Sequence, residues 1–363
     1  MKDGRVGDFD LESLEAQWDV AGAQPTRTTG RAHGRLESAL ALMRSNPDLQ
    51  KQVPHLQELA ASGSALFDFD LTQPGAAALA PRAASELSAR ISTVLEGVQF
   101  RLAPDLPPVE ALRGAVTYDS GRLQRSTLSA AWLGGPLTLK IGERRDRRGS
   151  ALTVQAQGFV DAKRLVALSQ IRPLTEVSGE TAWSGEFAYS PPVGTTPARW
   201  VGRADSALIG VTSELPAPLA KSASASLPLH IEISGTGDSS ELRANFADRL
   251  RAAFALDVVN REDWKIDRAA IRLGGGPATL PDDGVIQVRG HLRHLDAPAY
   301  VLAWQKLRES SPDTRADIDI SSDELSFGDR VFGDASVQIT ASAANPAATT
   351  LRVDAPSFGV LTG

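Results

Sequence analysis

The chain has 363 residues, a formal net charge of −6 and no cysteine. The lack of cysteine excludes disulfides, thiolate metal sites and cysteine nucleophiles. The chain is acidic and its arginines are scattered, so it offers no basic field for a phosphate backbone, and we expect no nucleic-acid partner. With 42% apolar and 23% charged residues, the composition is that of a folded globular protein rather than a disordered or membrane-embedded one.

The two ends of the chain suggest part of a longer protein. No apolar run of signal-peptide or transmembrane length follows Met1. The last residues, Leu351 to Gly363, still have the pattern of strand and turn. We therefore expect an internal fragment that carries neither an export signal nor an anchor of its own.

Taken in chain order, the sequence predicts many strands and few helices. Residues 1–80 are expected to form a β segment with a helical insertion at about 37–60. Residues 81–363 are expected to form a continuous repeating sheet with short helices near 162–171 and 297–307, and no firm boundary separates the two parts. Asp161 and Asp296 precede the last two helices and are predicted to cap them.

Alternation with a period of two is the dominant pattern. Leu229 and Ile231 face one way in the predicted strand, whereas His230 and Glu232 face the other. Polar residues on the second face predict an antiparallel sheet that helices do not cover on both sides. The same alternation recurs along the chain, at Phe67, Phe69 and Leu71; Leu137, Leu139 and Ile141; Leu152, Val154 and Ala156; Ile286 and Val288; Val337 and Ile339; and Leu351 and Val353.

The periodicity does not decide whether the apolar face is buried or open. Considered alone, the periodicity favours the buried core of closed barrels or sandwiches, and an open apolar groove is the alternative. The pattern predicts a mainly β fold in either case.

Motifs that carry catalysis are missing. The sequence has no phosphate-binding Walker loop, no HExxH helix and no nucleophile elbow. Asp317 and Asp319 share one face of a predicted strand, which allows a glycosidase pair or a calcium site but favours an ordinary solvent face. We expect no catalytic residue, no metal, no cofactor and no enzymatic activity.

Four stretches carry a resemblance to a known family. They are RAHGRLESALALMRSNPDL, LRGAVTYDSGRLQRSTLSAAWLGGPLTLKI at residues 112–141, SALIGVTSELPAPLAKSASASLPLHIEI, and GVIQVRGHLRHLDAPAYVLAW. Together they cover most of residues 30–310, and the chain resembles the YhdP-type, AsmA-like envelope proteins, which are related in architecture to TamB-like lipid-transport proteins. The residues of the most specific stretch that carry the signature are Leu215, Pro216, Pro218, Leu219 and Lys221.

The resemblance implies a long, twisted antiparallel sheet curled into an open groove with an apolar inner face. It implies a periplasmic body that an anchor elsewhere in the full-length protein tethers to the inner membrane. The function it implies is non-catalytic: to shield phospholipid acyl chains and guide them between the inner and outer membranes. The candidate groove-lining residues are Phe67, Phe69, Leu137, Leu139, Leu152, Val154, Leu227, Leu229, Ile231, Ile233, Ile286 and Val288.

Two other classes of function stay open. One is a structural or assembly scaffold of the cell envelope, with a closed β core and protein partners that pair with edge strands. The other is a carbohydrate-active β protein, which needs paired carboxylates in a cleft flanked by aromatic residues; the sequence shows no convincing pair. A filled interior, rather than an open apolar surface, would favour the scaffold.

Overall fold

The structure is a computed structural model. It describes residues 2–18, 25–45, 60–73, 88–101, 107–146, 149–169, 176–237, 239–260, 263–282, 284–302, 315–341, 349–356 and 359–362. The chain divides into two compact units, an N-terminal unit of residues 1–157 and 188–193 and a C-terminal unit of residues 158–187 and 194–363. The division near residue 80 that the sequence suggests stays a prediction.

The N-terminal unit is built from strands with one short helix. Its elements are β1 (Lys2–Val6), β2 (Phe9–Gln17), β3 (Thr26–Arg35), α1 (Leu36–Ser45), β4 (Ala60–Ser62), β5 (Ser64–Gln73), β6 (Ser88–Arg101), β7 (Val109–Asp119), β8 (Arg122–Leu123), β9 (Ser126–Trp132), β10 (Gly135–Asp146) and β11 (Gly149–Asp161), whose last residues lie in the C-terminal unit.

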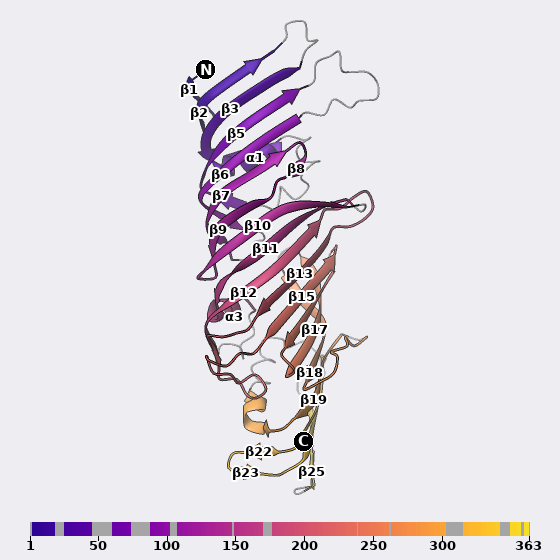
Figure 1. Ribbon diagram of the computed structural model, residues 1–363. Helices are drawn as coiled ribbons and strands as arrows, with labels where there is room; N and C mark the ends of the chain where they lie inside the picture. The colour runs from indigo at the N-terminus through magenta and orange to yellow at the C-terminus, as the bar shows by residue number, and fades with distance from the viewer. Residues whose placement is uncertain are drawn as a thin grey trace. The chain divides into compact units, whose positions relative to one another are not determined.

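Strands that follow one another in the chain are mostly neighbours in this unit. The antiparallel pairs run β1 to β2, β2 to β3, β3 to β5, β5 to β6, β6 to β7, β7 to β9 and β9 to β10. Figure 1 shows these strands side by side, coloured from indigo to magenta. Antiparallel neighbours can be joined by short turns, so no connection of this kind has to cross a face of the sheet.

The tight turns have the residues that their backbone requires. Ser120 and Gly121 both have positive φ, 48° and 80°, between the paired residues Asp119 and Arg122. Two consecutive positive φ values are what a two-residue hairpin needs, and glycine adopts them without steric cost. A two-residue turn at Ser120 and Gly121 therefore joins β7 to β8.

The C-terminal unit is also dominated by strands. Its elements are α3 (Ala162–Ser169), β12 (Val177–Ser190), which extends into the N-terminal unit, β13 (Arg199–Ser206), β14 (Val211–Ser213), β15 (Leu229–Thr236), β16 (Ser239–Phe246), β17 (Leu250–Asn260), β18 (Asp263–Leu273), β19 (Val285–Leu292), β20 (Leu295–Asp296), β21 (Arg315–Ser322), β22 (Leu325–Phe327), β23 (Arg330–Val331), β24 (Ala335–Ala341), β25 (Thr349–Ala355) and β26 (Gly359–Thr362).

Three of the described strand pairs in this unit are parallel, and one of them is the short pair of β20 with β22. Strands β13, β15, β16, β17 and β18 pair antiparallel in that order, as do β21, β24, β25 and β26. Between these groups, β18 pairs parallel with β19 and β19 parallel with β21. The sequence predicted antiparallel pairing throughout, and the difference matters because a parallel connection must return across a face of the sheet.

The two return connections use opposite faces. The first, residues 274–284, places Ala278 and Leu280 against Ala253 and Ala270 on the polar face. The second contains β20 and helical residues 297–302, and its Tyr300 packs on the apolar cluster that includes Ile318. These connections decide which parts of the sheet are covered.

The predicted short helices are confirmed where the structure describes them. The first helix ends at Ser45, and residues 46–59 of the predicted insertion lie outside the described residues, as do 303–307. Asp161 Oδ1 accepts a hydrogen bond from Lys163 N at 2.9 Å, and Asp296 Oδ1 accepts one from Ala299 N at 3.3 Å, so both predicted caps are present. The mainly β class, with open rather than barrel-closed sheets, is confirmed.

Candidate functional site

In the N-terminal unit, register places the apolar side chains on one face. One row across four strands joins Gly30, Phe69, Ile91 and Tyr118, and the next joins residues that include Phe67. Because strand side chains alternate, all of these point to the same side. The Phe69 ring covers Gly30, where an added Cβ would lie 2.5 Å from the ring.

The candidate residues of β10 and β11 belong to this same face. Leu139 lies opposite Leu128, and both belong with Phe67 to one apolar cluster. Leu137 lies two residues from Leu139 and so points to the same side. On β11, Ser150 donates a hydrogen bond to Glu143, which shares the side of Leu137 and Leu139.

Leu152 and Val154 lie two and four residues from Ser150, and alternation gives them that same side. Leu152 remains 38% exposed. The apolar face is therefore not sealed at this strand.

The C-terminal unit repeats the arrangement on β15. Leu229, Ile231 and Ile233 lie opposite Ser206, Ala204 and Gly202 of β13 on one side and opposite Phe246, Ala244 and Leu242 of β16 on the other. The three candidates are only partly buried. Leu227 precedes the strand, is 6% exposed and donates its N–H to the Ala207 carbonyl at 2.9 Å, so it belongs to a loop core rather than to the face.

Ile286 and Val288 occupy the same face in a more enclosed region. Ile286 is 7% exposed within a small cluster, and Val288 packs on two clusters. Within each unit the candidate strand residues thus share one face, although their burial differs from strand to strand.

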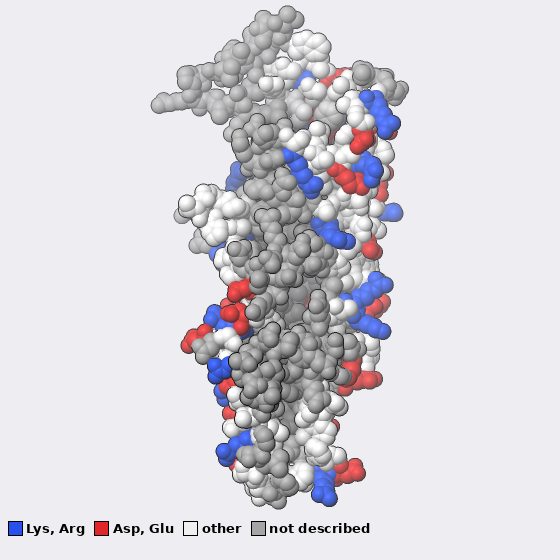
Figure 2. All heavy atoms as spheres, turned by 180° about the vertical axis from the view of Figure 1, so that it is seen from behind, with Lys and Arg blue, Asp and Glu red and all other residues white. Residues whose placement is uncertain are grey.

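The opposite face is a ladder of charged pairs. Arg27 donates two hydrogen bonds to Asp70, at 3.0 and 2.6 Å, and Arg31 donates one to Asp68 at 2.7 Å. The Arg27 hydrogen bonds lower the pKa of Asp70. Positive and negative side chains are interspersed along the right-hand margin of Figure 2. Such pairs suit a face in contact with water.

His230 gives this ladder a titratable member. Its Nδ1 lies 2.6 Å from Asp205 Oδ1, and its Nε2 lies 3.2 Å from Glu232 Oε1. Hydrogen bonding to Asp205, and secondarily to Glu232, raises the pKa of the imidazole. The predicted solvent-face assignment of Asp317 and Asp319 also fits, because both bind Arg289 across strands.

The signature residues Leu215 to Lys221 form a loop folded back on β14. Ser213 and Lys221 exchange backbone hydrogen bonds of 2.9 and 3.0 Å, which close the loop at its base. Leu215 is buried, and the loop continues with Pro218, whose carbonyl accepts a hydrogen bond from Arg249 at 3.2 Å. The loop therefore has a fixed backbone.

Lys221 is buried without a carboxylate partner among the described ion pairs. Its Nζ donates to the carbonyls of Val211 and Ser222 at 2.8 and 2.9 Å. Burial lowers the pKa of this lysine. The ammonium thus acts as a structural donor that ties the two ends of the loop together.

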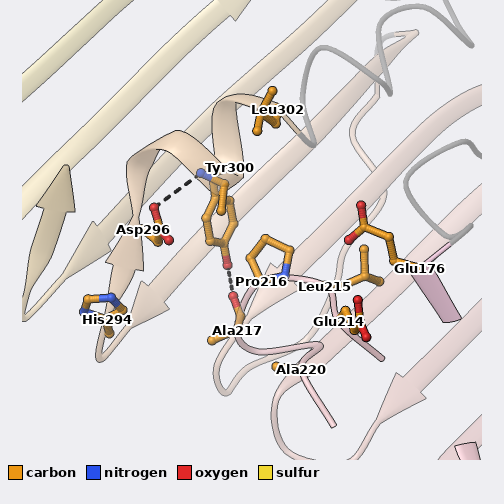
Figure 3. A pocket seen from close by; sticks show the side chains of 11 residues that line it. Glu176, Glu214, Leu215, Pro216, Ala217, Ala220, His294, Asp296, Tyr300 and Leu302 are labelled. Carbon is orange, nitrogen blue, oxygen red and sulfur yellow. Dashed lines mark hydrogen bonds between the residues drawn. The ribbon is translucent and has the colours of Figure 1, made fainter. Parts of the chain in front are cut away.

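A pocket of about 410 Å³ lies between this loop and the segment after β20. Figure 3 shows Tyr300 reaching across it, with its hydroxyl directed at the Ala217 carbonyl. Leu215 and Pro216 line one wall, and Leu302 lies beyond Tyr300. Burial raises the pKa of the Tyr300 phenol, so the hydroxyl stays protonated and donates.

The pocket is apolar with an acidic margin. Its carboxylates come from Glu176, Glu214 and Asp296, and His294 lies on the Asp296 side, with its Nδ1 2.9 Å from Glu324 Oε1 (Figure 3). Among the described residues that line it, none is a serine, threonine, cysteine or lysine. Its apolar walls suit the enclosure of an apolar group.

Sequence reasoning identified the loop as a signature but missed the pocket. Tyr300 lies in a predicted helix, and nothing in the periodicity places it beside a loop that is 83 residues away. Only the parallel connection, which periodicity does not show, brings the two segments together.

No group of three or more histidine, aspartate or glutamate side chains is arranged to hold a metal ion in the described ranges. None of the helices in the part of the chain that the structure describes is long and apolar enough to cross a membrane.

Fold and site define a class: a repetitive β protein whose open sheets are apolar on one face and charged on the other. Comparison with protein families then identifies the chain: the family described as YhdP protein matches residues 1–360, and the chain belongs to that family. Membership suggests an envelope-associated, AsmA-like protein, and the family is not known for enzymatic activity. Searches of curated proteins and of solved structures found no significant match.

Proposed function

We propose that this chain is a non-catalytic part of an envelope protein that holds phospholipid acyl chains against its apolar face. The observation that supports the proposal is that Leu229, Ile231 and Ile233 share one face and are only partly buried. In the N-terminal unit, Phe67 and Phe69 have the same character. Family membership favours placement in the envelope, and we propose a periplasmic body tethered to the inner membrane by another part of the full-length protein.

The energetics of lipid transfer explain why such a face is useful. Each methylene removed from water contributes about 0.8 kcal/mol, so a chain of about fifteen carbons outside a bilayer lacks roughly 12 kcal/mol of shielding. No single side chain supplies that amount, whereas a row of partly exposed aliphatic residues on successive strands can do so. The polar ladder on the other face keeps the sheet in water.

Site-specific photo-crosslinking on β15 tests the proposal. A benzophenone amino acid at Ile231 should capture phosphorus-32-labelled phospholipid in living cells, and the same probe at Glu232 should capture several-fold less. The two positions are adjacent in sequence and face opposite ways, so they are matched for expression and location. Equal capture at both positions would overturn the proposal.

The scaffold alternative makes a different forecast for the same two variants. If the apolar face is closed by protein, Ile231 should yield crosslinks within the chain or to protein partners and no labelled lipid. Native mass spectrometry of protein purified from cells provides a second readout, because a lipid-holding face should retain phospholipid. A consistently empty protein would count against acyl-chain binding.

A further inference from the structure

The polar face of the C-terminal unit carries a row of three arginines. Arg251 of β17 lies directly opposite Arg272 of β18, and Arg272 lies directly opposite Arg289 of β19. Neighbouring strands are about 4.8 Å apart, and like charges directly opposite each other destabilise a sheet. The row therefore weakens the protein unless an anion neutralises it.

Arginines elsewhere on the polar faces show how the charge is usually balanced. Arg27 and Arg31 form ion pairs with Asp70 and Asp68, and Arg203 donates to Glu186 at 2.8 Å. Arg289 follows this rule, since it bridges Asp317 at 2.8 Å and Asp319 at 3.2 Å.

Arg251 and Arg272 depart from that rule. Neither forms an ion pair with a carboxylate of the described residues. Arg251 Nη1 donates to the Gly276 carbonyl at 3.1 Å, and Arg272 Nε donates to the Gly275 carbonyl at 3.4 Å. Both guanidinium groups are thus gathered at one turn, and each keeps further N–H donors available.

A polar pocket of about 390 Å³ opens at this turn. Its lining includes Arg272, Arg289, Ser321 and Gly275. Asp319 also lines it, but Arg289 binds that carboxylate. The pocket therefore contains one arginine without a carboxylate partner among the described residues, Arg272, and Arg251 lies directly opposite it on β17.

We propose that Arg251 and Arg272 bind a phosphate group at this pocket. Guanidinium groups match the oxygens of phosphate with paired, charge-assisted hydrogen bonds, and a dianion neutralises two neighbouring arginines at once. The phosphate is either free or the headgroup of a lipid. The site lies on the face opposite Ile271 and Val288, so it does not depend on acyl chains binding to the apolar face.

Thermal unfolding of the full chain in phosphate, compared with chloride at equal ionic strength, tests the site. Phosphate should raise the unfolding temperature of the wild-type chain in a saturable manner. The R272Q variant should require about tenfold more phosphate for half of that effect, the size expected from losing one charged hydrogen bond. R251Q should behave like R272Q.

R243Q is the matched control, because Arg243 lies on the same polar face but pairs with Glu241. It should keep the phosphate response of the wild-type chain. Loss of repulsion should leave R272Q folded and no less stable in chloride, so a missing response cannot be ascribed to unfolding. An identical phosphate response in wild type and R272Q, or equal stabilisation by chloride, would overturn the proposal.

Vesicle flotation separates the two sources of phosphate. Vesicles of phosphatidylcholine with phosphatidic acid should carry the wild-type chain, but not R272Q, to the top of the gradient if the site takes a lipid headgroup. If free phosphate stabilises the chain and both proteins stay at the bottom, the site takes soluble phosphate.

Discussion

Two regions of the C-terminal unit, β15 to β17 and β18 to β21, have the same alternation but different surroundings. On β15, Ile231 is partly buried between two antiparallel neighbours. On β21, Ile318 is 7% exposed within a cluster on which Ala297 and Tyr300 pack from the return connection. The comparison teaches that alternation fixes which side chains share a face, whereas strand direction decides whether a connection must cover that face.

The largest expected effect is on stability, and it compares the covered Ile318 with the partly buried Ile231. Ile318→Ala should lower the free energy of unfolding of the C-terminal unit by ~2–5 kcal/mol, because it leaves a cavity under the return connection. Ile231→Ala should cost about half as much or less, since its side chain is already partly in water. Urea unfolding monitored within this unit measures both, with Ser234→Ala as the control on the polar face.

Equal losses for the two isoleucines would break the comparison. They would mean that Ile231 is packed as tightly as Ile318, and the open apolar face proposed for lipid would be a core instead.

The same strands show which features of the fold could be predicted from the sequence. Alternation placed Leu229 and Ile231 on one face and His230 and Glu232 on the other, and the register agrees. The caps at Asp161 and Asp296 followed from residue type and position. The parallel pairing of β19 with β18 and β21 could not be predicted from the sequence. Strand direction depends on where the chain returns in space, and parallel and antiparallel strands can show the same two-residue alternation.

The pocket was missed for the same reason. Leu215 and Pro216 are recognisable as a signature, but their neighbour Tyr300 comes from a connection that the antiparallel prediction does not contain. Likewise, each of the opposed arginines is ordinary in sequence. They form a charged row only through the register of three strands.

A smaller effect is expected where the covered region meets the signature loop. Tyr300→Phe removes the hydroxyl that donates to Ala217 but keeps the ring packed on its cluster. The loss should be about 1 kcal/mol and local, so the chain should still unfold at nearly the same urea concentration. Hydrogen exchange should become faster in residues 214–220, and the same change at Tyr118, in the N-terminal unit, should leave those amides unaffected. Unchanged exchange in Tyr300→Phe would show that the loop is fixed without this contact.

The smallest expected effect is the contribution of His230, on the polar face of β15, to the stability of the folded chain. Asp205 and Glu232 raise the pKa of His230 above 6.5, so their pairing stabilises the folded chain fully below that pH. The stabilisation disappears as the pH rises through the elevated folded-state pKa. Because the imidazole is 35% exposed, screening limits the effect to less than ~1 kcal/mol.

The stabilisation by the His230 pairing is measured by comparing the urea midpoints of the wild type and His230→Gln at several pH values. The two should differ most below pH 6.5, and the difference should shrink as the pH rises through the raised folded-state pKa of His230. Arg203 and Arg243 lie opposite Glu232 on the flanking strands but pair with Glu186 and Glu241. A difference that grows with pH would mean that His230 is stabilised in its neutral form, and the face it occupies would then be less wet than the ladder of ion pairs implies.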